Sequence, residues 1–269
     1  MSYRFTTLNT SILLGDMALA DQLQAAADHG FAEVELWWPF ANAAPSLRHQ
    51  DQVLKELAVA GMSLVSLNLY EGGMARGERG LVCRADSQRE LDDSLPVARR
   101  LLAETGCSLL NVLHGNHSTD EAESVQRERA ARRTAEIAED VAPLGATVLI
   151  EQLSNVPAYG LRTVHELLAG VEAARHYVTD GKVMIQFDAF HLARAGADLL
   201  DLLESHILDI GHIQLADLPD RGGPGTGDLD WEELLGTIDR LDYGGRVALE
   251  YSHYVSHPFE WMRPWQGER

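Results

Sequence analysis

Seven times along the chain, a helix-like segment ends in glycine and a short apolar run follows at once. Glycine suits the position just past a helix end, because it takes the left-handed conformation without a Cβ clash. The runs are rich in Val, Ile and Leu, as parallel strands buried on both faces should be. They follow Gly30, Gly61, Gly106, Gly145, Gly181, Gly211 and the pair Gly244–Gly245.

A further apolar run at residues 3–9 brings the expected strands to eight. Helix-length segments lie between them, and one of these begins with Ser118 and Glu121 at the spacing of a capping box. Strand and helix alternate throughout the 269 residues, and no Pro/Gly/Ser-rich linker divides them. The pattern predicts an α/β fold with one domain over residues 1–269, a (β/α)8 TIM barrel, with a doubly wound open sheet as the alternative.

The charge and cysteine content exclude several classes of partner. A formal net charge of −19 repels phosphate backbones, so a nucleic-acid partner is not expected. The two cysteines, Cys83 and Cys107, form no CxxC motif, which fits a reduced compartment. No run approaches 18 apolar residues. We therefore expect a cytoplasmic protein that acts on a small molecule and has no membrane partner.

The last four apolar runs end in side chains that carry oxygen. In a TIM barrel the active site gathers at the C-terminal ends of the strands, so these side chains should converge. Three carboxylates in one pocket cannot all stay ionised without a positive charge among them. Oxygen ligands suit one hard divalent ion, Mg²⁺ or Mn²⁺. Each residue alone could be a helix cap or a hydrogen-bonded buried group, but the shared position favours a metal site formed by Glu151, Asp188, Gln214 and Glu250.

Two of these ligands, Glu151 and Glu250, suggest a proton-transfer reaction. A metal that binds the carbonyl and hydroxyl oxygens of an α-hydroxy carbonyl substrate acidifies the neighbouring C–H bond. One glutamate would remove the proton and the other would return one. Return to the adjacent carbon is aldose–ketose isomerisation, and return to the other face of the same carbon is epimerisation. The glycine-rich residues 222–227 lack dinucleotide-binding spacing and predict a flexible active-site loop, or alternatively a phosphate or carboxylate cradle.

The chain resembles the xylose-isomerase-like barrels and, within them, the hydroxypyruvate isomerase group. The resemblance implies that Glu151, Asp188, Gln214 and Glu250 are the metal ligands, and that Glu151 and Glu250 are also the acid and base. It implies that His191 contacts the substrate or supports the ligands, and that Arg221 binds the substrate's carboxylate or hydroxyl unless it is a surface arginine. A homo-oligomer is a family-level expectation only. The matching stretches are residues 30–40, 77–81, 148–154, 185–191, 212–221 and 247–251.

The leading hypothesis is a metal-dependent isomerase of hydroxypyruvate or a 2-oxotetronate. The alternatives are a ketose 3-epimerase and a non-catalytic barrel that binds a sugar or acid. Related epimerases use histidine at the ligand position of the seventh strand, so Gln214 favours the isomerase branch.

Several roles stay open. Arg76, Arg79 and Arg84 would either bind an acid substrate or balance local acids. His114 stands where the hydroxypyruvate isomerase group more often has a small residue. Trp37 and Trp38 should face opposite sides, so that at most one of them lines the pocket.

Overall fold

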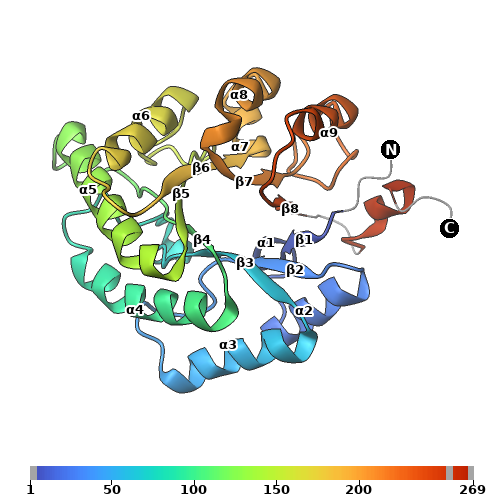
Figure 1. The fold of residues 1–269 in the computed structure, drawn as a ribbon, viewed down its shortest axis with the longest axis horizontal. Helices are drawn as coiled ribbons and strands as arrows, with labels where there is room; N and C mark the ends of the chain where they lie inside the picture. The colour runs from blue at the N-terminus through green and yellow to red at the C-terminus, as the bar shows by residue number, and fades with distance from the viewer. Residues whose placement is uncertain (1–4, 253–256, 266–269) are drawn as a thin grey trace.

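The strands form one closed parallel barrel in the order β1 to β8 (Figure 1). The computed structural model describes residues 5–252 and 257–265, so part of the range 1–269 expected for the domain lies outside the described residues. The predicted TIM barrel is confirmed, and the open-sheet alternative is wrong because β1 pairs with β8. The strands are β1 Thr7–Asn9, β2 Glu33–Leu36, β3 Ser63–Asn68, β4 Leu109–Asn111, β5 Thr147–Glu151, β6 Val183–Asp188, β7 Ile210–Leu215 and β8 Val247–Leu249.

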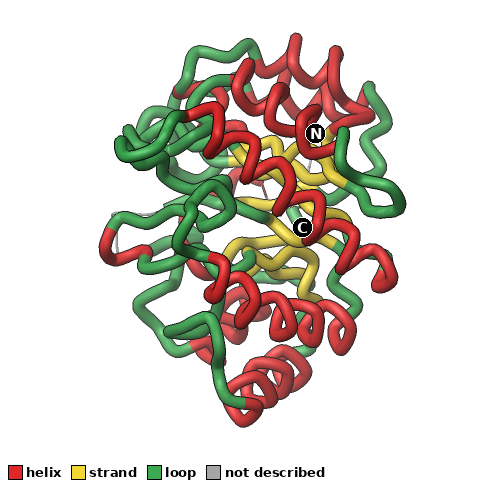
Figure 2. Tube along the Cα trace, turned by 90° about the vertical axis from the view of Figure 1, so that its left-hand side faces the viewer, coloured by secondary structure: helices red, strands yellow, loops and turns green. Residues whose placement is uncertain are grey.

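The helices surround the barrel, with the strands at the centre of the molecule (Figure 2). Among the described residues, no helix has the length and apolar character needed to cross a bilayer. The α-helices are α1 Thr10–Leu13, α2 Leu19–Asp28, α3 Leu47–Ala60, α4 Gln88–Thr105, α5 Glu123–Val141, α6 Val164–Arg175, α7 Ala189–Arg194, α8 Leu199–His206 and α9 Trp231–Arg240. The 3-10 helices are η1 Met74–Arg76, η2 Ala142–Leu144, η3 Ile207–Asp209 and η4 Glu260–Trp265.

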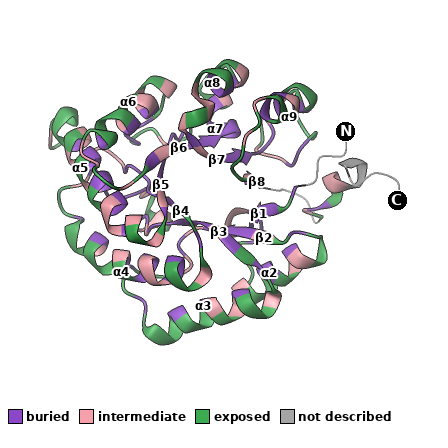
Figure 3. Cartoon of the chain, in the orientation of Figure 1, coloured by how far each residue is buried: buried purple, intermediate pink, exposed green. Residues whose placement is uncertain are grey.

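Burial follows this layering, with buried strands and helices whose outer faces are exposed (Figure 3). Side chains such as Leu8, Val34, Leu110 and Phe187 belong to the apolar core, as the apolar runs predict. Alternate strand positions instead carry buried polar groups that hydrogen bond to one another from strand to strand, as Asn111 does with Glu151. The barrel therefore has an apolar layer toward the helices and a polar interior.

The glycines predicted at the ends of helices are only partly observed there. Gly61, Gly106 and Gly145 each end a helix in the left-handed region, as expected. Gly181 instead allows a close approach, since a Cβ there would lie 2.6 Å from the carbonyl carbon of Ala138. The capping box predicted at Ser118 is wrong, because α5 begins only at Glu123. The capping box that the structure contains joins Thr163 and Glu166 at the start of α6.

Candidate active site

The four predicted ligands meet at one end of the barrel interior, where all four are buried. Glu151 and Asp188 are the last residues of β5 and β6, Gln214 lies one residue before the end of β7, and Glu250 follows β8. Ligand atoms of Glu151, Asp188 and His191 lie within 4.8 Å of one another. A pocket of about 230 Å³ opens above them and is lined in part by Glu151, His191, Arg221 and Glu250. Glu151 and Asp188 thus converge as expected, whereas Glu250 is not part of this group of ligand atoms and Gln214 does not line the pocket.

Arg221 lies between two of the carboxylates. Its Nη2 donates to Oδ2 of Asp188 at 2.9 Å and to Oε2 of Glu250 at 2.6 Å. Its guanidinium also lies 5.1 Å from the centre of the Phe190 ring. The backbone of Arg221 has a φ of 58°, a left-handed conformation that costs a non-glycine residue about 1–2 kcal/mol. Arg221 is therefore a largely enclosed member of the site, with 14% of its side chain exposed, and the alternative of a surface arginine is wrong.

Amide and indole donors hold the two glutamates. Oε1 of Glu250 accepts from Nδ2 of Asn9 at 2.9 Å and from Nε1 of Trp37 at 2.8 Å. Oε2 of Glu151 accepts from Nδ2 of Asn111 at 2.7 Å and from Nε2 of Gln186 at 2.9 Å. These donors leave each glutamate with a defined orientation. The sequence analysis missed Asn9, Asn111 and Gln186, although Asn9 and Asn111 are the last residues of β1 and β4 and could have been recognised from that position.

Gln214 is fixed through both atoms of its amide. Its Oε1 accepts from Nε2 of Gln186 at 2.8 Å, and its Nε2 donates to Oε2 of Glu35 at 2.7 Å. Glu35 is itself buried and hydrogen bonded to Nε2 of His212. The shared donor Gln186 therefore connects the carbonyl oxygen of Gln214 to the carboxylate of Glu151.

The charges in this cluster are unbalanced. Burial, with the charge of Asp188 adding to it, raises the pKa of Glu151 to about 8, while the hydrogen bond from Asn111 opposes the shift. Burial also raises the pKa of Glu250 well above its ordinary value, although Arg221 opposes this. Three carboxylates against one guanidinium leave an excess of two negative charges when all are ionised. One divalent cation with oxygen ligands would balance that excess, so the donor set fits Mg²⁺ or Mn²⁺.

The protonation of His191 is set by Ser154. The backbone N–H of Ser154 donates to Nδ1 of His191 at 3.2 Å, so Nδ1 is an acceptor and the neutral ring carries its proton on Nε2. Burial lowers the pKa of His191 to about 4, which keeps the ring neutral. Nε2 lies 3.8 Å from Oδ2 of Asp188. The geometry favours His191 as a hydrogen-bond donor over a metal ligand.

Another part of the pocket lining comes from the end of β3 and the segment that follows it. It includes Asn68, Glu71, Met74 and Arg79. Nδ2 of Asn68 donates to Oε1 of Glu71 at 2.6 Å. Burial raises the pKa of Glu71 to about 7, with Asn68 and the charge of Arg79 opposing the shift. Glu71 was missed because it lies beyond the strand end in a loop.

The three arginines of this segment differ in their partners. Arg76 pairs with Glu78 at 3.0 Å, and Arg84 pairs with Glu78 and, at 2.9 Å, with Asp86. Arg79 donates to the carbonyl oxygens of Met74 and Glu78, and it forms no ion pair with any carboxylate of the described residues. Arg76 and Arg84 thus balance local acids, while Arg79 faces the pocket.

Two further expectations concern the pocket rim. Trp37 lines the pocket, whereas Nε1 of Trp38 donates to the carbonyl of Asn42, so the prediction that at most one tryptophan lines the pocket is confirmed. The loop at residues 222–227 is anchored by Asp217. This carboxylate accepts hydrogen bonds from the backbone N–H groups of Gly227 and Leu229 and from the indole of Trp231. The anchoring argues against the predicted flexible loop.

Comparison with known proteins shows to which family this chain belongs. The profile of the xylose isomerase-like TIM barrel family matches residues 23–266. The chain belongs to that family, as the fold and the convergent strand ends lead one to expect.

Two relatives and one solved structure show what this chain is similar to. A Streptomyces coelicolor protein assigned provisionally as a hydroxypyruvate isomerase is 32% identical over 91% of this chain and 89% of its own. The 2-oxo-tetronate isomerase of Cupriavidus necator is 28% identical over 96% of this chain and 97% of its own. A crystal structure described as an AP endonuclease of family 2 from Brucella melitensis has a TM-score of 0.84 and 26% identity, and it covers 97% of this chain and 98% of its own.

Proposed function

We propose that this protein is a metal-dependent isomerase that interconverts a short 2-oxo-3-hydroxy acid and the isomer with its carbonyl at C3, which is an aldehyde in the case of hydroxypyruvate. Hydroxypyruvate and 2-oxotetronates are the proposed substrates. The observation that carries the proposal is the pair of buried glutamates, Glu151 and Glu250, which line one small pocket and both have raised pKa values. The names of the relatives support the same reaction class.

The metal and the two glutamates have separate tasks. Glu151, Asp188, Gln214 and Glu250 would hold one Mg²⁺ or Mn²⁺ ion, which when bound polarises the substrate's carbonyl and hydroxyl oxygens and acidifies the adjacent C–H bond. One glutamate takes the proton from C3 to give an enediolate and the other delivers a proton to C2, while the proton of the C3 hydroxyl is transferred to the oxygen on C2. The carbonyl thereby moves from C2 to C3, with no net gain or loss of electrons.

The remaining residues of the pocket orient the substrate. Nε2–H of His191 donates to a substrate oxygen, since Ser154 occupies the other ring nitrogen. Arg221 holds Asp188 and Glu250 in place and remains available to a substrate hydroxyl. Arg79 binds the substrate's carboxylate, because among the pocket arginines it is the one without a carboxylate partner in the described residues. A carboxylate-binding arginine favours an oxo acid over the neutral sugar that a ketose epimerase would bind.

Proton exchange in D₂O tests the proposal. The protein is incubated with Mn²⁺ or Mg²⁺ and with hydroxypyruvate, a 2-oxotetronate or a ketose, and the products are followed by NMR. We expect deuterium exchange at C3 and migration of the carbonyl to C3, which gives an aldehyde acid from hydroxypyruvate and a 3-oxo acid from a 2-oxotetronate. Inversion at a carbon without carbonyl migration would replace the proposal with an epimerase. Absence of exchange with every substrate would replace it with a non-catalytic binding barrel.

A further inference from the structure

A second cluster of metal-binding side chains lies outside the cluster of carboxylates. Cys83 comes from the segment between η1 and α4, and His114 and His117 come from the loop after β4. One ligand atom from each of these residues lies within 4.8 Å of the others. Cys83 and His114 are buried, and His117 is partly exposed. None of the three has a role in the proposed isomerase.

The two histidine rings bring their Nε2 atoms within hydrogen-bonding distance of one another. Their Nε2 atoms face one another at 3.1 Å. In a tetrahedral site with Zn–N bonds of about 2.0–2.1 Å, two ligand nitrogens lie about 3.3 Å apart. The observed separation is therefore close to the value that a shared ion requires.

Glycines preserve the space around these ligand atoms. A Cβ at Gly160 would lie 2.5 Å from Nε2 of both His114 and His117, and a Cβ at Gly115 would lie 2.7 Å from Sγ of Cys83. The two glycines are joined by a hydrogen bond of 3.0 Å from the N–H of Gly160 to the carbonyl of Gly115. Any other residue at either position would crowd the ligand atoms.

We propose that Cys83, His114 and His117 form a site for a divalent transition metal of the zinc class. Thiolate and imidazole ligands select such ions, whereas the oxygen ligands of the active site select Mg²⁺ or Mn²⁺. Water completes the coordination, because His117 is partly exposed. The ligand is the thiolate form of Cys83, so metal binding releases the thiol proton.

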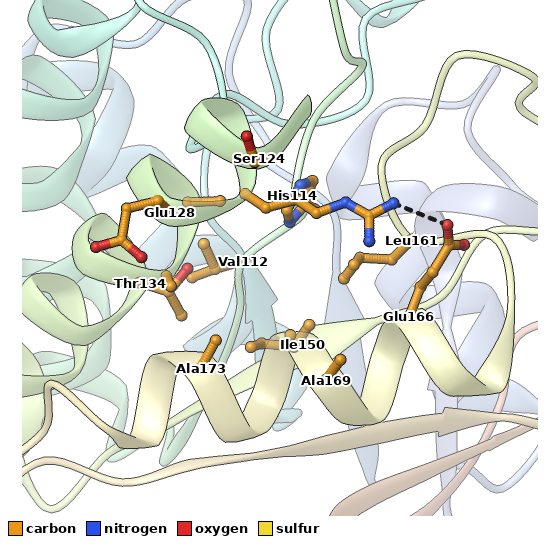
Figure 4. A pocket seen from close by; sticks show the side chains of 14 residues that line it. Val112, His114, Ser124, Glu128, Thr134, Ile150, Leu161, Glu166, Ala169 and Ala173 are labelled. Atoms are coloured by element: carbon orange, nitrogen blue, oxygen red, sulfur yellow. Dashed lines mark hydrogen bonds and ion pairs between the residues drawn. The ribbon is translucent and has the colours of Figure 1, made fainter. Parts of the chain in front are cut away.

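Two features of the surroundings fit this site. His114 also lines a cavity of about 320 Å³ between α5 and α6, next to the ion pair of Arg127 and Glu166 (Figure 4). This cavity and the exposed side of His117 give an ion two approaches. The site also joins the loops after β3 and β4, which bridge through Gly80 and His114. A bound ion would hold together loops that line the substrate pocket.

Cobalt provides the test, because a thiolate bound to Co²⁺ produces a charge-transfer band that oxygen ligands do not. The purified full-length protein is titrated with Co²⁺, and the near-ultraviolet band is recorded. We expect the band to saturate at one equivalent and to disappear on addition of Zn²⁺. It should be absent in Cys83→Ser, and the Zn²⁺ affinity of His117→Ala should fall by about 100-fold or more, beyond the usual effect of removing an outer-sphere partner.

Two variants serve as controls. Cys107→Ser removes the other buried cysteine and should keep the band, as should Glu151→Gln, which alters only the oxygen site. Thermal unfolding with and without Zn²⁺ confirms that Cys83→Ser folds. It also gives a second readout, because Zn²⁺ at 100 times its Kd raises the folded-to-unfolded ratio of the wild type about 100-fold. A wild type without a sulfur band, or a band that depends on Cys107, would overturn the proposal.

Discussion

The two halves of the barrel present different polar side chains at the same mouth. The chain around the ends of β5, β6 and β8 contributes the carboxylates Glu151, Asp188 and Glu250, whereas β1, β3 and β4 end in asparagine. Asn9 bonds to Glu250 where β1 meets β8, and Asn111 bonds to Glu151 where β4 meets β5. The donors thus lie at the two seams between the halves. One half carries the three proposed ligand carboxylates, and asparagines of the other half hydrogen bond to two of them.

Removing a carboxylate from the charged half should have the largest effect. Glu151→Gln or Glu250→Gln should lower kcat by 10²- to 10⁴-fold, because each variant deletes one of the two proton carriers. Steady-state kinetics at saturating Mn²⁺ measure the loss. Glu33→Gln is the matched control, since this strand glutamate bonds to Thr7 and Arg246 rather than to the site. A kcat near that of the wild type in either active-site variant would remove the mechanism.

Removing the donor Asn111, which lies where β4 meets β5, should have an intermediate effect on kcat. Asn111→Ala should lower kcat by about 10- to 100-fold, the usual cost of removing a group that orients a ligand. The hydrogen bond from Asn111 lowers the pKa of Glu151, so its loss should raise that pKa and move the acid limb of the kcat/KM profile to higher pH. Asn42→Ala, an exposed asparagine, provides the comparison. An unshifted pH profile would show that Asn111 has a structural role only.

Variants of two arginines after β3 should distinguish an effect on substrate binding from an effect on catalysis. Arg79→Met should raise KM by about 10- to 100-fold with little change in kcat, since a hydrogen bond to a charged group contributes about 1.5–3 kcal/mol. Arg76→Met should have no such effect, because the Arg76 side chain is 73% exposed and pairs with Glu78. Equal KM values for the two variants would assign the substrate's carboxylate to another group.

The smallest expected effect concerns the pH dependence of stability. The pKa of Glu71 is raised from 4.5 to about 7 in the folded protein, so its protonated form is favoured by folding. Its contribution to stability is complete below about pH 4.5 and is lost as the pH rises through 7. Glu71→Gln should therefore reduce the decline in Tm between pH 5 and 7.5 by a few degrees. Identical declines in the two proteins, measured by thermal unfolding, would contradict this.

The accuracy of the sequence analysis depended on how local each signal was. Glycines and apolar runs predicted the barrel because each reports on one helix end or one strand. The four proposed ligands could be selected from the sequence because each lies at or next to the end of its own strand. Asn9 was missed because its role in the site depends on its hydrogen bond to Glu250, which is 241 residues away in the sequence. The partners of Arg221 and Arg79 likewise depend on loop conformations that local patterns do not determine.

Tyr159 lies between the proposed zinc site and the proposed active site. Its hydroxyl accepts from the backbone N–H of His114 at 2.9 Å and donates to the backbone carbonyl of Glu151 at 3.1 Å. Any influence of an ion at His114 on substrate affinity must be matched by an equal influence of substrate on the affinity for that ion, because coupling free energy is reciprocal. The hydroxyl of Tyr159 would then connect the ion site to the substrate site, and the coupling free energy would be measured as the change in Zn²⁺ affinity on saturation with substrate.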